Sequence, residues 1–126
     1  MTEPIFITVE QVLRAHERSL HAYGGSSGIR DESLLRSAVA QLLNDYFCGH
    51  ADLFSIAAAY AFHIAQAQAF IDGNKRTAVV VALDFLEQNG IPAGTNTARL
   101  YDGMVSLAER RLSKSDLAQL FRELFG

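Results

Sequence analysis

A short polar run, Asp72-Gly73-Asn74-Lys75-Arg76, carries the side chains in this sequence that are best suited to chemistry. Glycine followed by asparagine lets the backbone turn so that successive N–H groups point into one concavity, which suits a phosphate. Lys75 would add a point charge and Arg76 a planar fork of donors, and both groups hold phosphate oxygens well. A carboxylate just before such a turn, Asp72, is placed to hold a magnesium ion shared with a nucleotide. The run therefore predicts a nucleotide-phosphate site.

The same run also has a plain structural explanation. Asp-Gly-Asn is a good turn sequence, and a Lys-Arg pair is common on a solvated surface. However, two cations in the first turn of a helix oppose its macrodipole, at about 0.3–1 kcal/mol each, and a bound polyphosphate would offset that cost. The run also joins two helices that are expected to be buried, so the turn should lie at the floor of a cleft. We therefore favour the binding site.

The elements that must position this turn are helices, because caps and helical spacing recur along the chain and strand patterns are almost lacking. Thr8 and Gln11 form a capping-box pattern before the first helix, and Asp31 and Asp52 can cap the second and third. The expected helices are 9–23, 32–44, 53–68, 74–89, 97–108 and a last one capped by Ser113 or Ser115. Residues 26–30 are expected to form an irregular loop.

The third and fourth of these helices are apolar nearly all round. In the third, Ile56, Tyr60 and Ile64 form one stripe and a second apolar stripe lies beside it. The fourth leaves only a narrow polar strip, and helices of this kind belong at the centre of a fold. The sequence therefore predicts an all-α protein, a compact bundle of about six helices around two central buried helices.

Length and composition limit the remaining possibilities. The 126 residues fit a single domain, 1–126, and the net charge of −3 with scattered Lys and Arg argues against direct nucleic-acid binding. The single Cys48 excludes an internal disulfide and a thiolate zinc site. The acidic N-terminus lacks a secretory pattern, and the apolar run 56–70 is interrupted by polar residues, which excludes a membrane span. A soluble, cytoplasmic protein is expected.

Residues 70–78, Phe-Ile-Asp-Gly-Asn-Lys-Arg-Thr-Ala, resemble the core motif of the Fic/Doc family, usually written His-x-Phe-x-Asp-Gly-Asn followed by Gly-Arg or Lys-Arg. Lys75 stands where adenylyl-transferring Fic enzymes usually carry Gly, and this choice is similar to the death-on-curing (Doc) branch. Four short segments of this chain also resemble the N-terminal half of these toxins: Gly-Gly at 24–25, Gly-Ile-Arg-Asp at 28–31, Leu-Leu at 34–35 and Ser-Ala at 37–38. The resemblance spans most of the chain.

The resemblance implies a Fic fold and the role of toxin in a type II toxin–antitoxin pair, with an antitoxin segment docked in the active-site groove. It also implies transfer of the γ-phosphoryl of ATP, with Mg²⁺, to a threonine of elongation factor Tu, which arrests translation. Gly73, Asn74, Lys75 and Arg76 would bind the nucleotide and Asp72 the metal. The catalytic positions would be Asp72, Lys75, Arg76 and the place of the motif histidine.

That histidine would stand at position 68, where this chain has Gln68. A side-chain amide has no useful basicity near neutral pH, so Gln68 could orient a hydroxyl but not deprotonate it. Loss of a positioned base costs roughly 10²–10⁴-fold in rate, although phosphoryl transfer depends mainly on positioning and charge neutralisation. Three functions therefore stay open: a Doc-type protein kinase, active or attenuated; an inactive protein that binds antitoxin or nucleotide; and an adenylyltransferase, which Lys75 disfavours.

The other candidate residues have structural explanations. His63 is expected to be a core histidine, with a place at the border of the cleft as the alternative. His16, His21 and His50 are expected on the surface. Phe70 is expected to anchor the motif in the core. By the resemblance, Arg30 and Asp31 belong to a flap that guides the target peptide, and a surface ion pair between them is the alternative.

Overall fold

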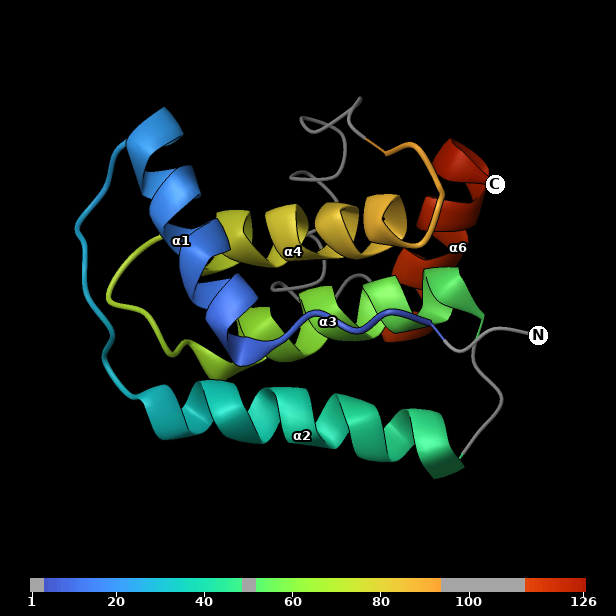
Figure 1. Cartoon of the computed structure of the whole chain (residues 1–126), viewed down its shortest axis with the longest axis horizontal. Helices are drawn as coiled ribbons and strands as arrows, with labels where there is room; N and C mark the ends of the chain where they lie inside the picture. The colour runs from blue at the N-terminus through green and yellow to red at the C-terminus, as the bar shows by residue number, and fades with distance from the viewer. Residues whose placement is uncertain (1–3, 49–51, 94–112) are drawn as a thin grey trace.

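The computed structural model describes residues 4–48, 52–93 and 113–126, and over these residues the chain forms five helices. Within the same residues, extended pairing is limited to an isolated antiparallel bridge between Ile29 and Phe70. The all-α class is confirmed, and the helix expected at 97–108 lies outside the described residues. The helices, labelled as in Figure 1, are α1 (Val9–Tyr23), α2 (Glu32–Cys48), α3 (Leu53–Ala67), α4 (Asn74–Gln88) and α6 (Lys114–Phe125).

The expected caps begin the helices. Thr8 and Gln11 form a complete capping box at α1, and the Asp52 side chain accepts the Ser55 N–H at 2.8 Å at the start of α3. Ser113 caps α6 with a second capping box.

The predicted end of α2 was wrong, because the helix continues past residue 44 to Cys48. Tyr46 extends its apolar face and packs edge-on against Phe6, with ring centroids 5.1 Å apart.

The core is built around α3 and α4, as expected. These helices lie antiparallel and side by side in Figure 1, and α3 also packs against α2 and α6, while α1 packs against α4. Tyr60 of α3 and Phe85 of α4 are among the largest fully buried side chains, with ring centroids 5.4 Å apart. The loop between α3 and α4 therefore joins the two central helices of the fold.

The N-terminal segment before α1 is tied to both central helices. The buried Tyr60 hydroxyl accepts the Ile7 N–H at 2.8 Å and donates to the Ile7 carbonyl at 2.9 Å. Asn89, at the end of α4, pairs with the backbone N–H and carbonyl of Ile5. Burial raises the pKa of Tyr60 to about 12. The segment thus fixes where α1 starts and how it crosses α4.

Among the described helices, none is long and apolar enough to cross a membrane. The apolar α3 has 15 residues, and its apolar side chains are used in the protein core.

Candidate functional site

The polar run lies at the turn between α3 and α4, and two left-handed residues bound this turn. Gln68, just after α3, has φ 47° and ψ 45°, and Gly73, just before α4, has φ 78° and ψ 20°. Gln68 is the one non-glycine residue with positive φ in the described part of the chain. Such backbone costs about 1–3 kcal/mol and persists only where surrounding contacts impose it.

The Asn74 side chain holds the turn closed from inside. Its Oδ1 accepts the Phe70 N–H at 3.1 Å, and its Nδ2 donates to the Phe70 carbonyl at 3.0 Å. Phe70 itself is buried in the core, as expected of an anchor. Asn74 therefore acts on the turn through its side chain, whereas the sequence indicated only a backbone role for it.

The Asp72 carboxylate accepts two backbone hydrogen bonds. Oδ2 accepts the Ser26 N–H at 3.1 Å, and Oδ1 accepts the Gly73 N–H at 2.8 Å. These bonds, that from Ser26 first, lower the pKa of Asp72, so the group is ionised at neutral pH. The carboxylate is exposed and held in one orientation beside the start of α4.

Asp72 suits magnesium better than metals that need several protein ligands. Within the described ranges there is no group of three or more His, Cys, Asp or Glu side chains that could hold a metal ion. Magnesium, however, is commonly held by one or two carboxylates together with substrate phosphates and water. A single fixed carboxylate therefore fits a magnesium ion that arrives with a nucleotide.

The N-terminus of α4 is open to an anion. Gly73 provides no side-chain cap, and the first turn contains no acidic residue. Unsatisfied N–H groups and the positive end of the helix dipole favour a bound anion at such a terminus. Lys75, half-buried, and Arg76, exposed, stand in the same turn. The residues that the sequence indicated for phosphate binding are consecutive in the chain and lie at this terminus.

The loop of residues 24–31 pairs with this turn, and both lie on the same side of the molecule in Figure 1. The Arg30 N–H donates to the Ala69 carbonyl at 2.7 Å, and the Ile71 N–H donates to the Gly28 carbonyl at 3.2 Å. The Arg30 guanidinium also donates to the Gln68 carbonyl, from Nε at 3.0 Å and Nη2 at 2.7 Å. The loop is therefore an ordered partner of the turn, which the expectation of an irregular loop did not include.

Arg30 and Asp31 do not form the ion pair that was considered as an alternative. The Arg30 guanidinium contacts the Gln68 carbonyl, whereas the Asp31 carboxylate accepts the Ser33 N–H at 3.0 Å and so caps α2 as predicted; the Asp31 N–H also donates to the Ala69 carbonyl at 3.0 Å. Two glycines allow the close approach of loop and turn. A Cβ at Gly25 would lie 2.7 Å from Asp72 Oδ2, and one at Gly28 would lie 2.8 Å from Cδ1 of Ile71.

The expectation of a surface position for His16 was wrong. Its side chain is 3% exposed, its Nε2 lies 2.8 Å from the Asp72 carbonyl, and its ring stacks on Phe70 with centroids 3.8 Å apart. A sequence signal existed, because His16 falls one turn after the buried Val12 and one turn before the buried Ser19. The face of α1 that carries these residues is turned toward the motif.

The other two histidines in the described part of the chain are His21 and His63. His21 is exposed as expected, His50 lies outside the described residues, and His63 is half-buried and edge-on to Phe62, at 5.2 Å between ring centroids. A carbonyl oxygen only accepts hydrogen bonds, so Nε2 of His16 carries its proton where it meets Asp72. His16 therefore does not stand in for the missing histidine at the exposed Gln68.

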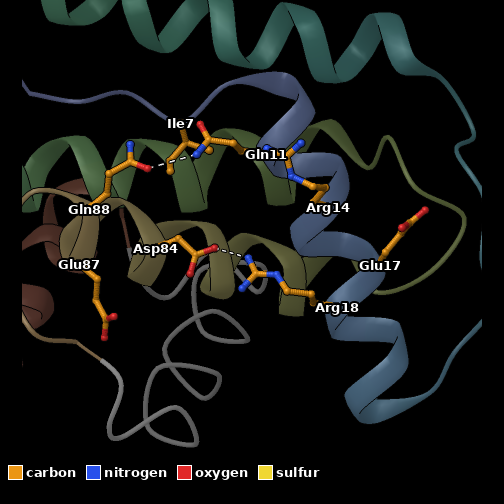
Figure 2. Close-up of a pocket in the computed structure, with 8 residues that line it drawn as sticks. All are labelled: Ile7, Gln11, Arg14, Glu17, Arg18, Asp84, Glu87 and Gln88. Atoms are coloured by element: carbon orange, nitrogen blue, oxygen red, sulfur yellow. Dashed lines mark hydrogen bonds and ion pairs between the residues drawn. The ribbon is translucent and has the colours of Figure 1, made fainter.

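A groove of about 590 Å³ lies between α1 and α4, apart from the turn (Figure 2). Arg18 pairs with Asp84 across it, and Gln11 donates to Gln88 at 3.2 Å. None of the residues of the polar run lines this groove. The groove is lined by Ile7, Gln11, Arg14, Glu17, Arg18, Asp84, Glu87 and Gln88.

Comparison with known proteins identifies the family. The sequence matches the model of the Fic/DOC family over residues 6–86, which include the loop 24–31 and the whole turn. The chain belongs to the Fic/DOC family. The resemblance predicted from residues 70–78 is thereby confirmed, and so is the all-α Fic fold.

Two named members of the Fic/DOC family are similar over most of the chain. A protein of Escherichia phage P1 named protein kinase doc is 32% identical over 124 residues, covering 95% of this chain and 95% of that protein. A protein of Mycolicibacterium smegmatis named toxin Doc is 36% identical over 109 residues, covering 83% of this chain and 82% of that protein. Both similarities extend well beyond the motif.

Proposed function

We propose that this Fic/DOC protein is a Doc-type toxin that binds ATP at the start of α4 and transfers the γ-phosphoryl to a hydroxyl of a protein. The observation that carries the proposal is the uncapped N-terminus of α4, with Lys75 and Arg76 in its first turn and the fixed Asp72 carboxylate beside it. The similarity to a protein named as a kinase supports phosphoryl transfer.

Each residue then has a defined part in the reaction. The first-turn amides of α4, with Lys75 and Arg76, hold the phosphates and offset their charge. Asp72, ionised and fixed by two N–H groups, would hold magnesium, which when bound neutralises charge on the phosphoryl group. Gln68 would orient the attacking hydroxyl through its carboxamide without taking its proton. Such a site works by positioning and electrostatics.

The proposed target is a threonine of elongation factor Tu, whose modification would arrest translation in the cytoplasm. The loop 24–31 would guide the target segment, since it borders the turn, and each of the two segments presents an exposed apolar side chain: Ile29, which is 42% exposed, and Ile71, which is 60% exposed. A cognate antitoxin segment would bind over the same surface and so block both nucleotide and target. The similarity to a protein named as a toxin supports this pairing.

Gln68 favours a second candidate function, a catalytically inactive protein that binds nucleotide or antitoxin. The exposed carboxamide has no basicity, and the His16 nitrogen that meets the turn, Nε2, carries a proton and so has no lone pair to act as a base. Phosphate binding does not depend on a base, so it would survive in such a protein. The adenylyltransferase reaction is the variant that Lys75 disfavours.

Labelled ATP separates these functions. The protein is incubated with a translation extract and ATP labelled at the γ or the α position, beside Gln68→His, Lys75→Ala and, as a matched first-turn lysine of another helix, Lys114→Ala. Transfer of γ label that Lys75→Ala abolishes and Lys114→Ala retains would support the kinase. Transfer by Gln68→His alone would support the inactive binder, and transfer of α label would overturn phosphoryl transfer.

A further inference from the structure

We propose that His16 is a positioning residue of the nucleotide site, which fixes the Asp72 carboxylate by holding the backbone of the turn from α1. The inference rests on the proposed function, because it assigns His16 to the site that would hold MgATP. It concerns a buried titratable side chain that has no part in the transfer chemistry described above.

The His16 ring contacts the turn on both sides of Asp72. Before it, the ring stacks on Phe70 with an interplanar angle of 10° and centroids 3.8 Å apart. After it, a Cβ at Gly73 would lie 3.8 Å from the Cδ2 and Nε2 atoms of His16, so the ring lies directly against this glycine. Between them, Nε2 meets the Asp72 carbonyl at 2.8 Å. One side chain of α1 therefore spans most of the turn.

The hydrogen bond from His16 orients the peptide unit between Asp72 and Gly73, whose N–H donates to the Asp72 carboxylate. In a trans peptide the carbonyl and the following N–H point in opposite directions, and the described residues contain no cis bond. When His16 holds the Asp72 carbonyl, the Gly73 N–H must point to the other side, where it donates to Asp72 Oδ1 at 2.8 Å. The contact to the backbone is thus transmitted to the carboxylate.

The loop 24–31 completes this arrangement from outside. The second carboxylate oxygen, Oδ2, accepts the Ser26 N–H at 3.1 Å. The backbone carbonyl of Asp72 is therefore held by α1, and its side chain is held by the loop. Without the His16 donor, the peptide unit between Asp72 and Gly73 would lose the contact that holds its carbonyl. Both the carboxylate and the amide concavity at the start of α4 would then lose their fixed geometry.

A core histidine that only filled space would affect stability alone, so the test must read the turn itself. His16→Phe keeps an aromatic ring for the stack but removes the donor, whereas His16→Gln keeps an N–H donor near the position of Nε2. His21→Phe is the matched control, because His21 is exposed on the same helix. Each variant is studied by two-dimensional NMR of its backbone amides and by calorimetric titration with MgATP, and histidine ring ¹⁵N spectra of the natural protein give the tautomer of His16.

The expected spectrum shows His16 protonated at Nε2. His16→Phe should shift the Gly73 and Ser26 amides and weaken MgATP binding roughly 3- to 10-fold, as expected for one lost hydrogen bond. His16→Gln should recover part of both effects, and His21→Phe should change neither. An unprotonated Nε2, or unchanged Gly73 and Ser26 amides in His16→Phe, would overturn the proposal.

Two further outcomes are also decisive. If the natural protein does not bind MgATP, the proposed function fails. The ring tautomer of His16 and the amide shifts of Gly73 and Ser26 still test the role of His16 in that case. If His16→Phe does not fold, the tautomer of the natural protein and the partial recovery in His16→Gln decide, and a Gln variant that folds with displaced turn amides and no gain in binding would contradict the proposal.

Discussion

The guanidinium of Arg30 donates two hydrogen bonds to the backbone carbonyl of Gln68, from Nε at 3.0 Å and Nη2 at 2.7 Å. Gln68 ends α3 in a left-handed conformation, and its carbonyl belongs to the negative end of that helix. A cation at this position donates hydrogen bonds to the carbonyl and interacts favourably with the helix dipole. The residue in the place of the motif histidine thus has its backbone set by a loop far away in sequence.

Arg30→Ala should therefore loosen the backbone at position 68. We expect the free energy of unfolding to fall by about 1–2 kcal/mol, as for a lost hydrogen bond to a charged donor at the surface, and the Ile71 amide to exchange faster with solvent. Urea unfolding and hydrogen exchange measure the two effects. Arg36→Ala, which removes an exposed pair with Glu32 on α2, should change stability by less than half of that amount. Equal effects of the two variants would contradict the role of Arg30.

Asn74→Ala should open the turn from inside. The variant leaves the half-buried N–H and carbonyl of Phe70 without the side chain that satisfies both, at about 1–3 kcal/mol of stability. It should also weaken MgATP binding, because the start of α4 is no longer tied to the turn. Thermal unfolding and calorimetric titration test this. Asn44→Ala on the exposed face of α2 serves as the control, and an Asn74 variant that matches it would refute the prediction.

Tyr60→Phe should detach the N-terminal segment from the core. The buried Ile7 backbone loses both its donor and its acceptor, which should cost about 1–3 kcal/mol at neutral pH. The folded-state pKa of about 12 lies above the ordinary 10.0, so this group's contribution is complete below pH 10 and lost as the pH rises through 12. Unfolding measured across this range should show an alkaline loss in the natural protein that Tyr60→Phe reduces. An unchanged alkaline profile would count against the assignment.

Asp72→Asn should reduce the acid sensitivity of the fold. The backbone N–H groups of Ser26 and Gly73 lower the folded-state pKa of Asp72 below 3.8, so its contribution is present above that pH and lost as the pH falls through the folded value. Asp116, in the first turn of α6, accepts the N–H of the N-cap residue Ser113, which lowers the pKa of Asp116 and gives a matched comparison. Both Asn variants should flatten the acid limb of stability against pH, but only Asp72→Asn should weaken MgATP binding. Weakening by Asp116→Asn as well would argue that the effect is not local.

Contacts within one element could be predicted from the sequence, and contacts between elements could not. The capping box at Thr8, the cap at Asp52 and the buried faces of α3 and α4 follow from spacing within a helix, and each is found in the structure. The turn at Asp72 to Arg76 was also found from local residue types. These features need no knowledge of the partner element.

The supports of the turn depend on parts of the chain that are distant in sequence. His16 is 56 residues from Asp72, and Arg30 is 38 residues from Gln68. A polar residue on a mostly polar helix such as α1 gives no sign of which neighbour it faces, and a glycine-containing loop gives no sign of its pairing partner. Only the packing of α1 and the loop 24–31 against the motif reveals both roles.

The central claim is that the start of α4 binds nucleotide phosphates, and calorimetric titration of MgATP into the natural protein, Lys75→Ala and Lys114→Ala tests it most directly. We predict saturable binding to the natural protein, roughly tenfold or more weaker binding to Lys75→Ala after loss of a charge-assisted contact, and unchanged binding to Lys114→Ala. No binding to the natural protein, or equal binding to all three, would contradict the account.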